Sequence, residues 1–531
     1  MKADFSFING KIYTMETKGD FVEAFSVYDR KFTACGTTDE ILEDPGKKVI
    51  DLGGAIIVPG MIDAHQHTLY HAKNLQTVDL SNTASWEEAK KILKEKADMM
   101  PYGSWIHAAG FDHQKWRVPE LPLKEDLDEI STRHPIVIDR YCLHVHVVNS
   151  KVLDIVGIKK GYIPHIENTI GFDESDEPNG IIWDSGIAPV LKFMPDPLED
   201  YEIKKQAVYD VLTDMNKYGI TGVHPVQGKI VDSYEYLGLY QDLDKEGRLT
   251  VRMYVSFDEL PPFGMKTGFG NNMVKYGFYK IYSDGNLGSR SAAMLEPFSD
   301  RPDMKGVLNY SQDEITAMCQ EAYDKDLQIG IHAIGDKGLD IVLKAIEKVY
   351  YKNPKNDPRF RLIHAFITNE DLIMRIKRLP VIIDMQPCFL STNVTWAEDR
   401  LGPERIKYAF PWRRMVDEGI ILTASSDLPV EHYNPFWGIY AIVARKNLEG
   451  FPKEGWYPNQ RVTTYEALEM YTKNAAYASF EEDIKGTIKT GKLADFVVLD
   501  RDPFDTDIDS LKDIKVRRTY LGGRLVYSSD N

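Results

Sequence analysis

The sequence predicts an α/β fold built around a closed barrel of eight parallel strands, and two observations support this prediction. Short β-rich runs recur eight times in the middle of the chain, and each is separated from the next by a stretch long enough for a helix. Both chain ends instead alternate apolar and polar residues over short runs, which is typical of small antiparallel strands. We therefore expect a (β/α)8 barrel and a separate β layer made from the two termini.

The eight predicted barrel strands are the β-rich runs themselves. They cover residues 55–67, 221–227, 250–258, 276–285, 328–336, 360–367, 380–387 and 421–429. Two intervening segments, 313–326 and 338–352, repeat apolar residues at intervals of three and four, which predicts helices that bury one face.

Turn signals organise the chain ends. Asn9-Gly10 and Asp29-Arg30 interrupt the first apolar runs, and Gly522-Gly523 interrupts the last one, so hairpins are expected at both ends. We predict a composite β-sandwich domain from residues 1–54 and 485–531, with the barrel over 55–484. The gap between the first two barrel strands is too long for one crossover, which predicts an inserted lobe over about 70–215. Insertions at the carboxyl ends of barrel strands lie over the active site in such folds.

Composition excludes several classes of protein. The 531 residues contain 64 Lys and Arg against 81 Asp and Glu, a formal charge of −17, which argues against a nucleic-acid binder. The four cysteines lack CxxC spacing, and the first residues lack the apolar core of a signal peptide. No uninterrupted apolar run approaches the roughly 20 residues that cross a bilayer. We expect a cytoplasmic protein that binds neither nucleic acid nor membrane.

The strongest local signal is a His-x-His pair at the end of the first predicted strand, in Asp63-Ala64-His65-Gln66-His67. Residues two apart in a strand point to the same side, so His65 and His67 can direct their imidazoles at one point. This arrangement suits a divalent metal, although a lone pair of this kind is as often structural.

Three further residues strengthen the metal hypothesis. His332, His364 and Asp427 lie near the ends of the fifth, sixth and eighth predicted strands. Because catalytic residues of a barrel come from the carboxyl ends of several strands, these side chains are expected to converge with the His-x-His pair. Four histidines and a carboxylate suit zinc, or manganese or iron with less preference. The alternative is that all five are unrelated core or surface residues.

Lys280, in the fourth predicted strand, is an unusual residue for the mouth of a barrel. An ammonium group there is costly unless it is paired. It could pair with Asp284 or Asp427, or it could be modified chemically.

Several phrases resemble the amidohydrolase superfamily of metal-dependent hydrolases. The entry phrase VPGMIDAHQH and the closing phrase GTIKTGKLADFVVLD carry the general resemblance. FDHQKW, HVHVVNS, KIYSDGNLGSRSA, HAIGD, LGPERIKYAFPWRRM and SSDLPV are similar to the amidohydrolase 3 group, which includes N-substituted formamide deformylases. The resemblance runs nearly end to end and implies a TIM barrel with a β-sandwich built from both chain ends.

The resemblance also implies roles for these residues. The metal ligands would be His65, His67, Lys280, His332, His364 and Asp427. Lys280 would be carboxylated to N6-carboxylysine and would bridge two metals, although some relatives work with one metal and an unmodified lysine. One or two divalent ions, with zinc expected, would supply hydroxide, and Asp427 would act as the proton shuttle.

Substrate contacts are expected from both the inserted lobe and the barrel. His144, before an Asn-Ser pair, matches the family's candidate donor to the substrate carbonyl, with His146 as the alternative. His113 and Trp116 are candidates for the same family reason. His224 lies near the end of the second strand, and Arg290 could meet a substrate carboxylate, or form an ordinary ion pair.

The sequence thus favours hydrolysis of the C–N bond of a small amide or N-substituted formamide. A deaminase or cyclic amidase of the same superfamily is the first alternative, and a catalytically inactive scaffold is the second. Members of the family often form dimers, so a homodimer is expected.

Overall fold

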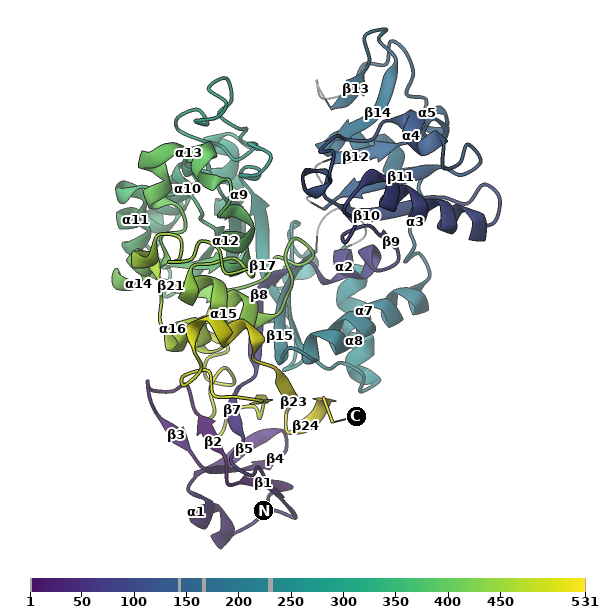
Figure 1. Ribbon diagram of the computed structural model, residues 1–531. Coiled ribbons are helices and arrows are strands. Elements are labelled where there is room, and N and C mark those ends of the chain that lie inside the picture. The colour runs from purple at the N-terminus through teal and green to yellow at the C-terminus, as the bar shows by residue number, and fades with distance from the viewer. Residues whose placement is uncertain (1, 142–144, 165–168, 228–232, 531) are drawn as a thin grey trace. The chain divides into compact units, whose positions relative to one another are not determined.

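The computed structural model describes residues 2–141, 145–164, 169–227 and 233–530 (Figure 1). An eight-stranded parallel sheet forms the centre of the larger part of the chain. In barrel order its strands are β8 (Met61–Gln66), β15 (Ile220–Gln227), β16 (Arg252–Phe257), β17 (Val274–Tyr282), β18 (Ile329–Ala333), β19 (Phe360–His364), β20 (Val381–Met385) and β21 (Ile421–Ala424). Each pairs in parallel with its neighbour. The predicted α/β barrel is therefore confirmed.

The barrel is nearly closed where β21 approaches β8. No strand ladder joins these two strands, but the chain just beyond β21 runs beside the end of β8. The Asp427 N–H donates to the His65 carbonyl at 2.9 Å, and the His67 N–H donates to the Leu428 carbonyl at 2.8 Å. These bonds lie at the carboxyl ends of the strands, where the predicted metal ligands are found.

The first predicted strand, residues 55–67, is divided in two at Gly60. Its first half, β7 (Ile56–Pro59), joins a terminal sheet, and only β8 enters the barrel. A side chain at position 60 would lie 2.1 Å from the Thr221 hydroxyl, so only glycine fits where the chain passes between the two sheets.

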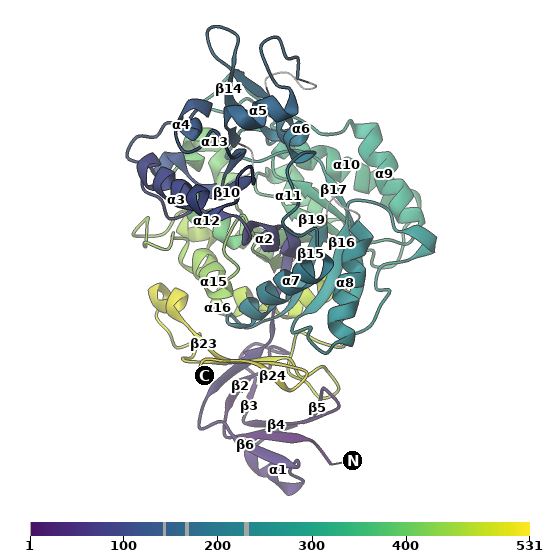
Figure 2. The same ribbon diagram turned by 90° about the vertical axis from the view of Figure 1, so that its right-hand side faces the viewer.

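Helices pack around the outside of the barrel (Figure 2). They are α7 (Tyr201–Asn216), α8 (Ser233–Lys245), α9 (Gln312–Asp324), α10 (Asp336–Lys352), α11 (Glu370–Lys377), α12 (Pro387–Asn393), α13 (Ala397–Arg405), α14 (Trp412–Asp417), α15 (Pro435–Ala444), α16 (Thr464–Tyr471) and α17 (Lys473–Ala478). The two helices expected from periodicity are present as α9 and α10, and their apolar faces are buried. Between β16 and β17, residues 258–273 form a loop with one 3₁₀ turn where a barrel helix would stand.

Two sheets lie beside the barrel, one built from the N-terminal segment alone and one from both chain ends, and both termini are marked there in Figure 1. The first sheet contains β5 (Lys31–Gly36), β4 (Ala24–Tyr28), β1 (Phe5–Ile8) and β6 (Lys48–Asp51), next to α1 (Thr38–Glu43). The second sheet contains β24 (Arg524–Ser528), β23 (Val516–Leu521), β22 (Phe496–Leu499), β7, β2 (Lys11–Tyr13) and β3 (Phe21–Val22). Phe7, Phe25 and Phe32 pack against Phe496 and Tyr520 between them. The N- and C-terminal segments therefore share one apolar core.

A second compact unit covers Leu69–Val208. Its six-stranded sheet has the order β13 (Ile170–Phe172), β14 (Pro178–Trp183), β12 (Val145–Val148), β11 (Ile136–Arg140), β10 (Ile106–Phe111) and β9 (Val78–Asp79). Its helices are α2 (Thr68–Asn74), α3 (Trp86–Met99), α4 (Lys124–Asp128), α5 (Ser150–Val156) and α6 (Ala188–Leu191). Apolar clusters cover both faces of this sheet, so the insertion has a core of its own.

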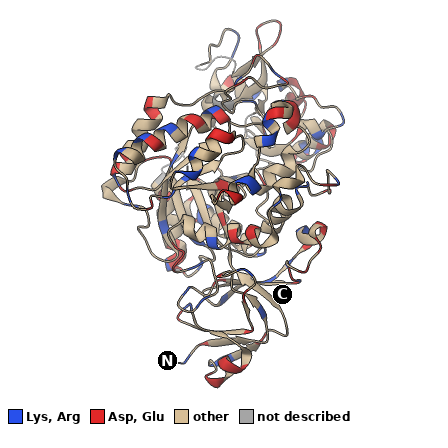
Figure 3. Cartoon of the chain, turned by 90° about the vertical axis from the view of Figure 1, so that its left-hand side faces the viewer, with Lys and Arg blue, Asp and Glu red and all other residues tan. Residues whose placement is uncertain are grey.

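Acidic and basic residues are interspersed along the helices in Figure 3. Among the described helices, none combines the length and the apolar character that a bilayer-spanning segment needs.

Candidate metal centre

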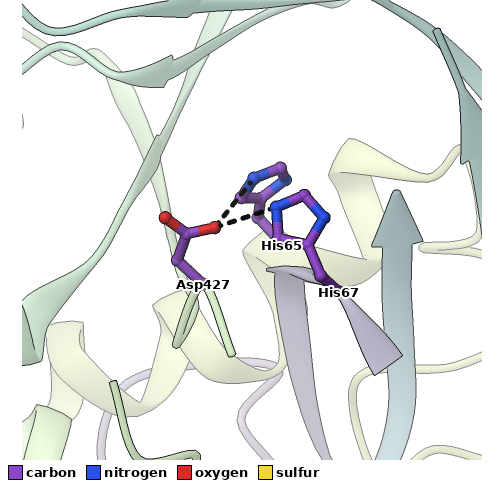
Figure 4. Close-up of side chains that lie close together, drawn as sticks. All are labelled: His65, His67 and Asp427. Atoms are coloured by element: carbon purple, nitrogen blue, oxygen red, sulfur yellow. Dashed lines mark ion pairs between the residues drawn. The ribbon is translucent and has the colours of Figure 1, made fainter. Parts of the chain in front are cut away.

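Three predicted ligands meet at the mouth of the barrel (Figure 4). The Nε2 atoms of His65 and His67 each lie 3.3 Å from Oδ1 of Asp427, and the ligand atoms of all three residues lie within 4.8 Å of one another. His65 is only 1% exposed, whereas the side chain of His67 is 26% exposed. The Nδ1 atom of His67 lies 3.2 Å from the carbonyl of Val226, which leaves Nε2 to face Asp427.

His332 and His364 lie beside this group. Their ring centroids are 4.4 Å apart, and the His364 ring is 5.8 Å from that of His65. Nε2 of His332 lies 3.1 Å from the Gly285 carbonyl and 3.5 Å from an Asp284 carboxylate oxygen. Nδ1 of His364 lies 2.6 Å from the side-chain oxygen of Gln386. The four predicted histidine ligands therefore form one cluster, and three of them have one ring nitrogen held by an oxygen.

The backbone is unusual at two of the predicted ligands. His364 has φ of 79° and Asp427 has φ of 56°, in the left-handed region that side chains other than glycine rarely adopt. Ala365, next to His364, also lies there, with φ of 48°. Such positions cluster at functional sites, because the surrounding structure must hold them in place.

Lys280 is buried in the same region and has no hydrogen-bond partner among the described residues. It is 1% exposed, and its Nζ lies 4.8 Å from the centre of the Tyr282 ring. Burial lowers the pKa of its amine to about 7, despite the opposing attraction of Asp427. Asp284, one of the two partners predicted for Lys280, instead accepts backbone hydrogen bonds from Ala293, Ile334 and Gly335.

The donor set fits a divalent metal. Burial raises the pKa of the Asp427 carboxyl, but contact with His65 and His67 outweighs it and holds that pKa well below the usual range. Burial also lowers the pKa of His65, which favours the neutral imidazole that binds metals. Two ligand atoms on one tetrahedral zinc lie roughly 3.4 Å apart, given zinc–ligand distances near 2.1 Å. The observed separations of 3.3 Å are close to that spacing, so the residues present fit a divalent metal.

A buried polar group that the sequence reasoning missed supports the cluster from inside the barrel. Arg361 pairs with Asp384 at 2.7 Å, and both side chains are fully buried. Asp384 also accepts a hydrogen bond from Thr423 at 2.7 Å, and Arg361 donates to the Ala64 carbonyl at 2.6 Å. The sequence could have indicated this pair, because Arg361 and Asp384 are charged residues inside predicted barrel strands and a buried charge needs a partner.

His224 lies inside the barrel and is fully buried, with its ring 5.1 Å from that of Tyr254. Burial lowers its pKa well below the ordinary value. Its predicted contact with a substrate stays a prediction.

Arg290 forms an ion pair within the protein, which was the predicted alternative to contact with a substrate carboxylate. Its guanidinium contacts both carboxylate oxygens of Asp300, at 3.2 and 2.6 Å. Arg400 contacts the same carboxylate at 2.8 Å. Arg290 is therefore engaged within the protein, and its predicted binding of a substrate carboxylate stays a prediction.

Three of the predicted substrate-contact residues belong to the inserted unit. Trp116 is 4% exposed, stacks on Phe111 and donates to the Thr83 hydroxyl at 3.2 Å, so it is part of that unit's core. His113 begins a 3₁₀ turn, and burial lowers its pKa. His144 lies outside the described residues. Substrate contacts by these three residues stay predictions.

Comparisons with known proteins identify the family of this chain. The model of the amidohydrolase family matches residues 48–527. The amidohydrolase YtcJ of Bacillus subtilis is 31% identical over 98% of both chains. An N-substituted formamide deformylase of Arthrobacter pascens is 28% identical over 99% of this chain and 98% of that protein.

The crystal structure of a metal-dependent hydrolase from Pyrococcus furiosus has the same fold. The two sequences are 28% identical. The superposition covers 94% of this chain and all of the Pyrococcus chain, with a TM-score of 0.75. The chain belongs to the amidohydrolase family, whose structural neighbours include metal-dependent hydrolases.

Proposed function

We propose that this protein is a metal-dependent amidohydrolase that cleaves the C–N bond of a small amide or N-substituted formamide. The observation that carries the proposal is the convergence of His65, His67 and Asp427 within 4.8 Å at the mouth of the barrel. The likeness to the Arthrobacter pascens formamide deformylase favours this bond over others.

The chain's own residues divide the work of such a hydrolysis. A bound divalent metal lowers the pKa of water and polarises the substrate carbonyl. His65, His67, His332 and His364 would hold the metal through neutral imidazoles. Asp427, whose pKa is well below the usual range, is an ionised base that can take a proton from the attacking water and deliver it to the leaving nitrogen.

In this proposal the chemical form of Lys280 determines whether the site binds one metal or two. As an ammonium it would repel a cation, whereas a carbamate formed with carbon dioxide would be an anionic ligand. Because burial lowers its pKa to about 7, a large share of the amine is uncharged near neutral pH and can attack carbon dioxide. Zinc is the expected ion in either case.

Metal content per chain is the first test, measured by elemental mass spectrometry on protein purified without chelators and supplied with bicarbonate. We expect one or two metals per chain and hydrolysis within a panel of N-acyl and N-formyl amines. Ammonia release from aminated heterocycles instead of amide cleavage would favour the deaminase alternative. A chain that binds no metal after reconstitution and hydrolyses none of these compounds would contradict the proposal.

A further inference from the structure

Gln386 connects three neighbouring barrel strands beside the candidate metal centre. It follows β20 directly, occupies the position before the first residue of α12 and is fully buried. Its amide contacts the backbone of Asp384 on its own strand, Ser425 beyond β21, and His364 at the end of β19. No role was assigned to it from the sequence.

These contacts determine which way the amide faces. The Gln386 Nε2 lies 3.0 Å from the Asp384 carbonyl, which can only accept a hydrogen bond. The same nitrogen lies 2.9 Å from the Ser425 hydroxyl, whose proton is directed to the Met385 carbonyl at 3.0 Å. A flipped amide would place two oxygens against each other. The NH₂ group therefore faces these acceptors, and the side-chain oxygen faces His364.

The orientation of the amide fixes the protonation of His364. An amide oxygen can only accept, so Nδ1 of His364, 2.6 Å away, must carry a proton. A neutral imidazole has one proton, which leaves the lone pair on Nε2. His67 and His332 have backbone carbonyls for the same contact, from Val226 and Gly285, which no substitution removes.

We propose that Gln386 is the positioning residue that fixes His364 as an Nε2 metal ligand. The inference rests on the proposed function, because it assumes that His364 binds a metal. Partners of this kind fix both the tautomer and the ring orientation of a ligand, and their loss typically weakens metal binding by about 10–100-fold.

The test compares metal release from three variants of the metal-loaded protein. Gln386→Leu removes the acceptor at similar volume, and Gln386→Glu keeps an oxygen for Nδ1. Gln328→Leu is the matched control: Gln328 is also buried, and it bonds to Tyr254 and to the carbonyls of Arg359 and Ala478 rather than to a predicted ligand. The readout is the rate of zinc transfer to a chromophoric chelator, with thermal unfolding followed in parallel.

We expect Gln386→Leu to release zinc about 10–100-fold faster than the wild type. Gln328→Leu should lower the unfolding temperature without changing release. Gln386→Glu should release zinc at a rate nearer to the wild type than to Gln386→Leu. Equal release from Gln386→Leu and Gln328→Leu, or from the Glu and Leu variants, would overturn the inference.

A measurement on the wild type keeps the inference testable if Gln386→Leu fails to fold. In protein with ¹⁵N-labelled histidine, His364 is assigned by its loss in His364→Asn, and we expect its Nδ1 to carry the proton. A proton on Nε2 instead would overturn the inference. This readout needs no catalysis and can be made on metal-free protein, so it separates failure of the inference from failure of the proposed function.

Discussion

Asp63 on β8 accepts two hydrogen bonds from Ser426, which lies 363 residues later, just beyond β21. The Ser426 N–H donates at 3.0 Å and its hydroxyl donates at 2.5 Å. Asp63 also lies 3.4 Å from the backbone N–H of His65. One carboxylate therefore joins the first and last strands of the barrel directly beside the predicted ligands His65 and Asp427.

We predict that Ser426→Ala destabilises the barrel where it closes. The substitution removes the hydroxyl donor and leaves a buried carboxyl with fewer partners, which costs about 1–3 kcal/mol. Urea unfolding followed by circular dichroism should show a lower midpoint than the wild type. An unchanged midpoint would mean that this contact is not needed for closure.

If Asp427 is the proton shuttle, the Asp427→Asn variant should lose catalytic turnover. The amide keeps the size of the side chain but cannot take a proton, so turnover should fall about 10²–10⁴-fold. Asp417→Asn is the control, because the Asp417 side chain is 59% exposed and pairs with Arg413 on the surface. Initial rates on the best amide substrate are compared between the two variants and the wild type, and circular dichroism verifies that each variant is folded. Activity retained in Asp427→Asn would exclude this role.

Lys280 predicts a dependence on carbon dioxide. Since burial lowers its pKa to about 7, the uncharged amine predominates above that pH and can form a carbamate, losing a proton as the N–C bond forms. ¹³C-bicarbonate at pH 8 should give a carbamate resonance in the wild type that is absent from Lys280→Met. The same signal in both proteins would place the carbamate elsewhere, and no signal in either would leave Lys280 unmodified.

Much of the barrel could be predicted because each strand is a separate apolar run with a helix-length segment after it. The segment 55–67 shows the limit of that reasoning. Its apolar run is continuous, and the division at Gly60 follows from a close approach to Thr221, which a linear pattern does not contain.

The candidate site shows the same limit. Histidines at strand ends could be placed together, because the carboxyl ends of parallel strands meet at one edge of a barrel. The partners of those histidines depend on contacts between distant segments, such as Gln386 with His364. Asp284 was one of two carboxylates proposed as partners of Lys280, and it accepts backbone N–H groups from the loops after β17 and β18.

In the inserted unit, Asp139 predicts a local stability effect. Its two carboxylate oxygens each lie 2.6 Å from a histidine nitrogen, of His107 and of His146. Burial raises the pKa of Asp139, but the two histidines outweigh it and hold that pKa well below the usual range. Asp139→Asn weakens both of these buried hydrogen bonds and should therefore destabilise this unit by about 1–3 kcal/mol. Hydrogen exchange by mass spectrometry should show faster exchange in β11 and β12 than in the barrel strands, and uniform exchange rates would contradict the prediction.

A buried ion cluster predicts how stability depends on pH. Glu481 is 4% exposed and contacts the amines of Lys275, at 2.8 Å, and Lys485. Burial raises the pKa of Glu481, but attraction to the two lysines outweighs it and lowers that pKa to about 2. The unfolded chain, with an ordinary pKa near 4.3, then binds more protons than the folded chain between these values. The stabilisation is present above about pH 4.3 and is lost as the pH falls towards 2.

The Glu481→Gln variant isolates the contribution of this cluster to acid stability from that of the other carboxyl groups that titrate at low pH. The variant should lose about 3–5 kcal/mol at pH 7, because Lys485 remains buried without its carboxylate partner. At lower pH the difference from the wild type should shrink, because the unfolded wild-type chain takes up a proton on Glu481 below about pH 4.3 that the folded chain does not bind, and this proton uptake favours unfolding. Urea unfolding at pH 7 and at pH 3 gives both values. A difference that stays constant across this range would show that Glu481 does not titrate with the predicted shift.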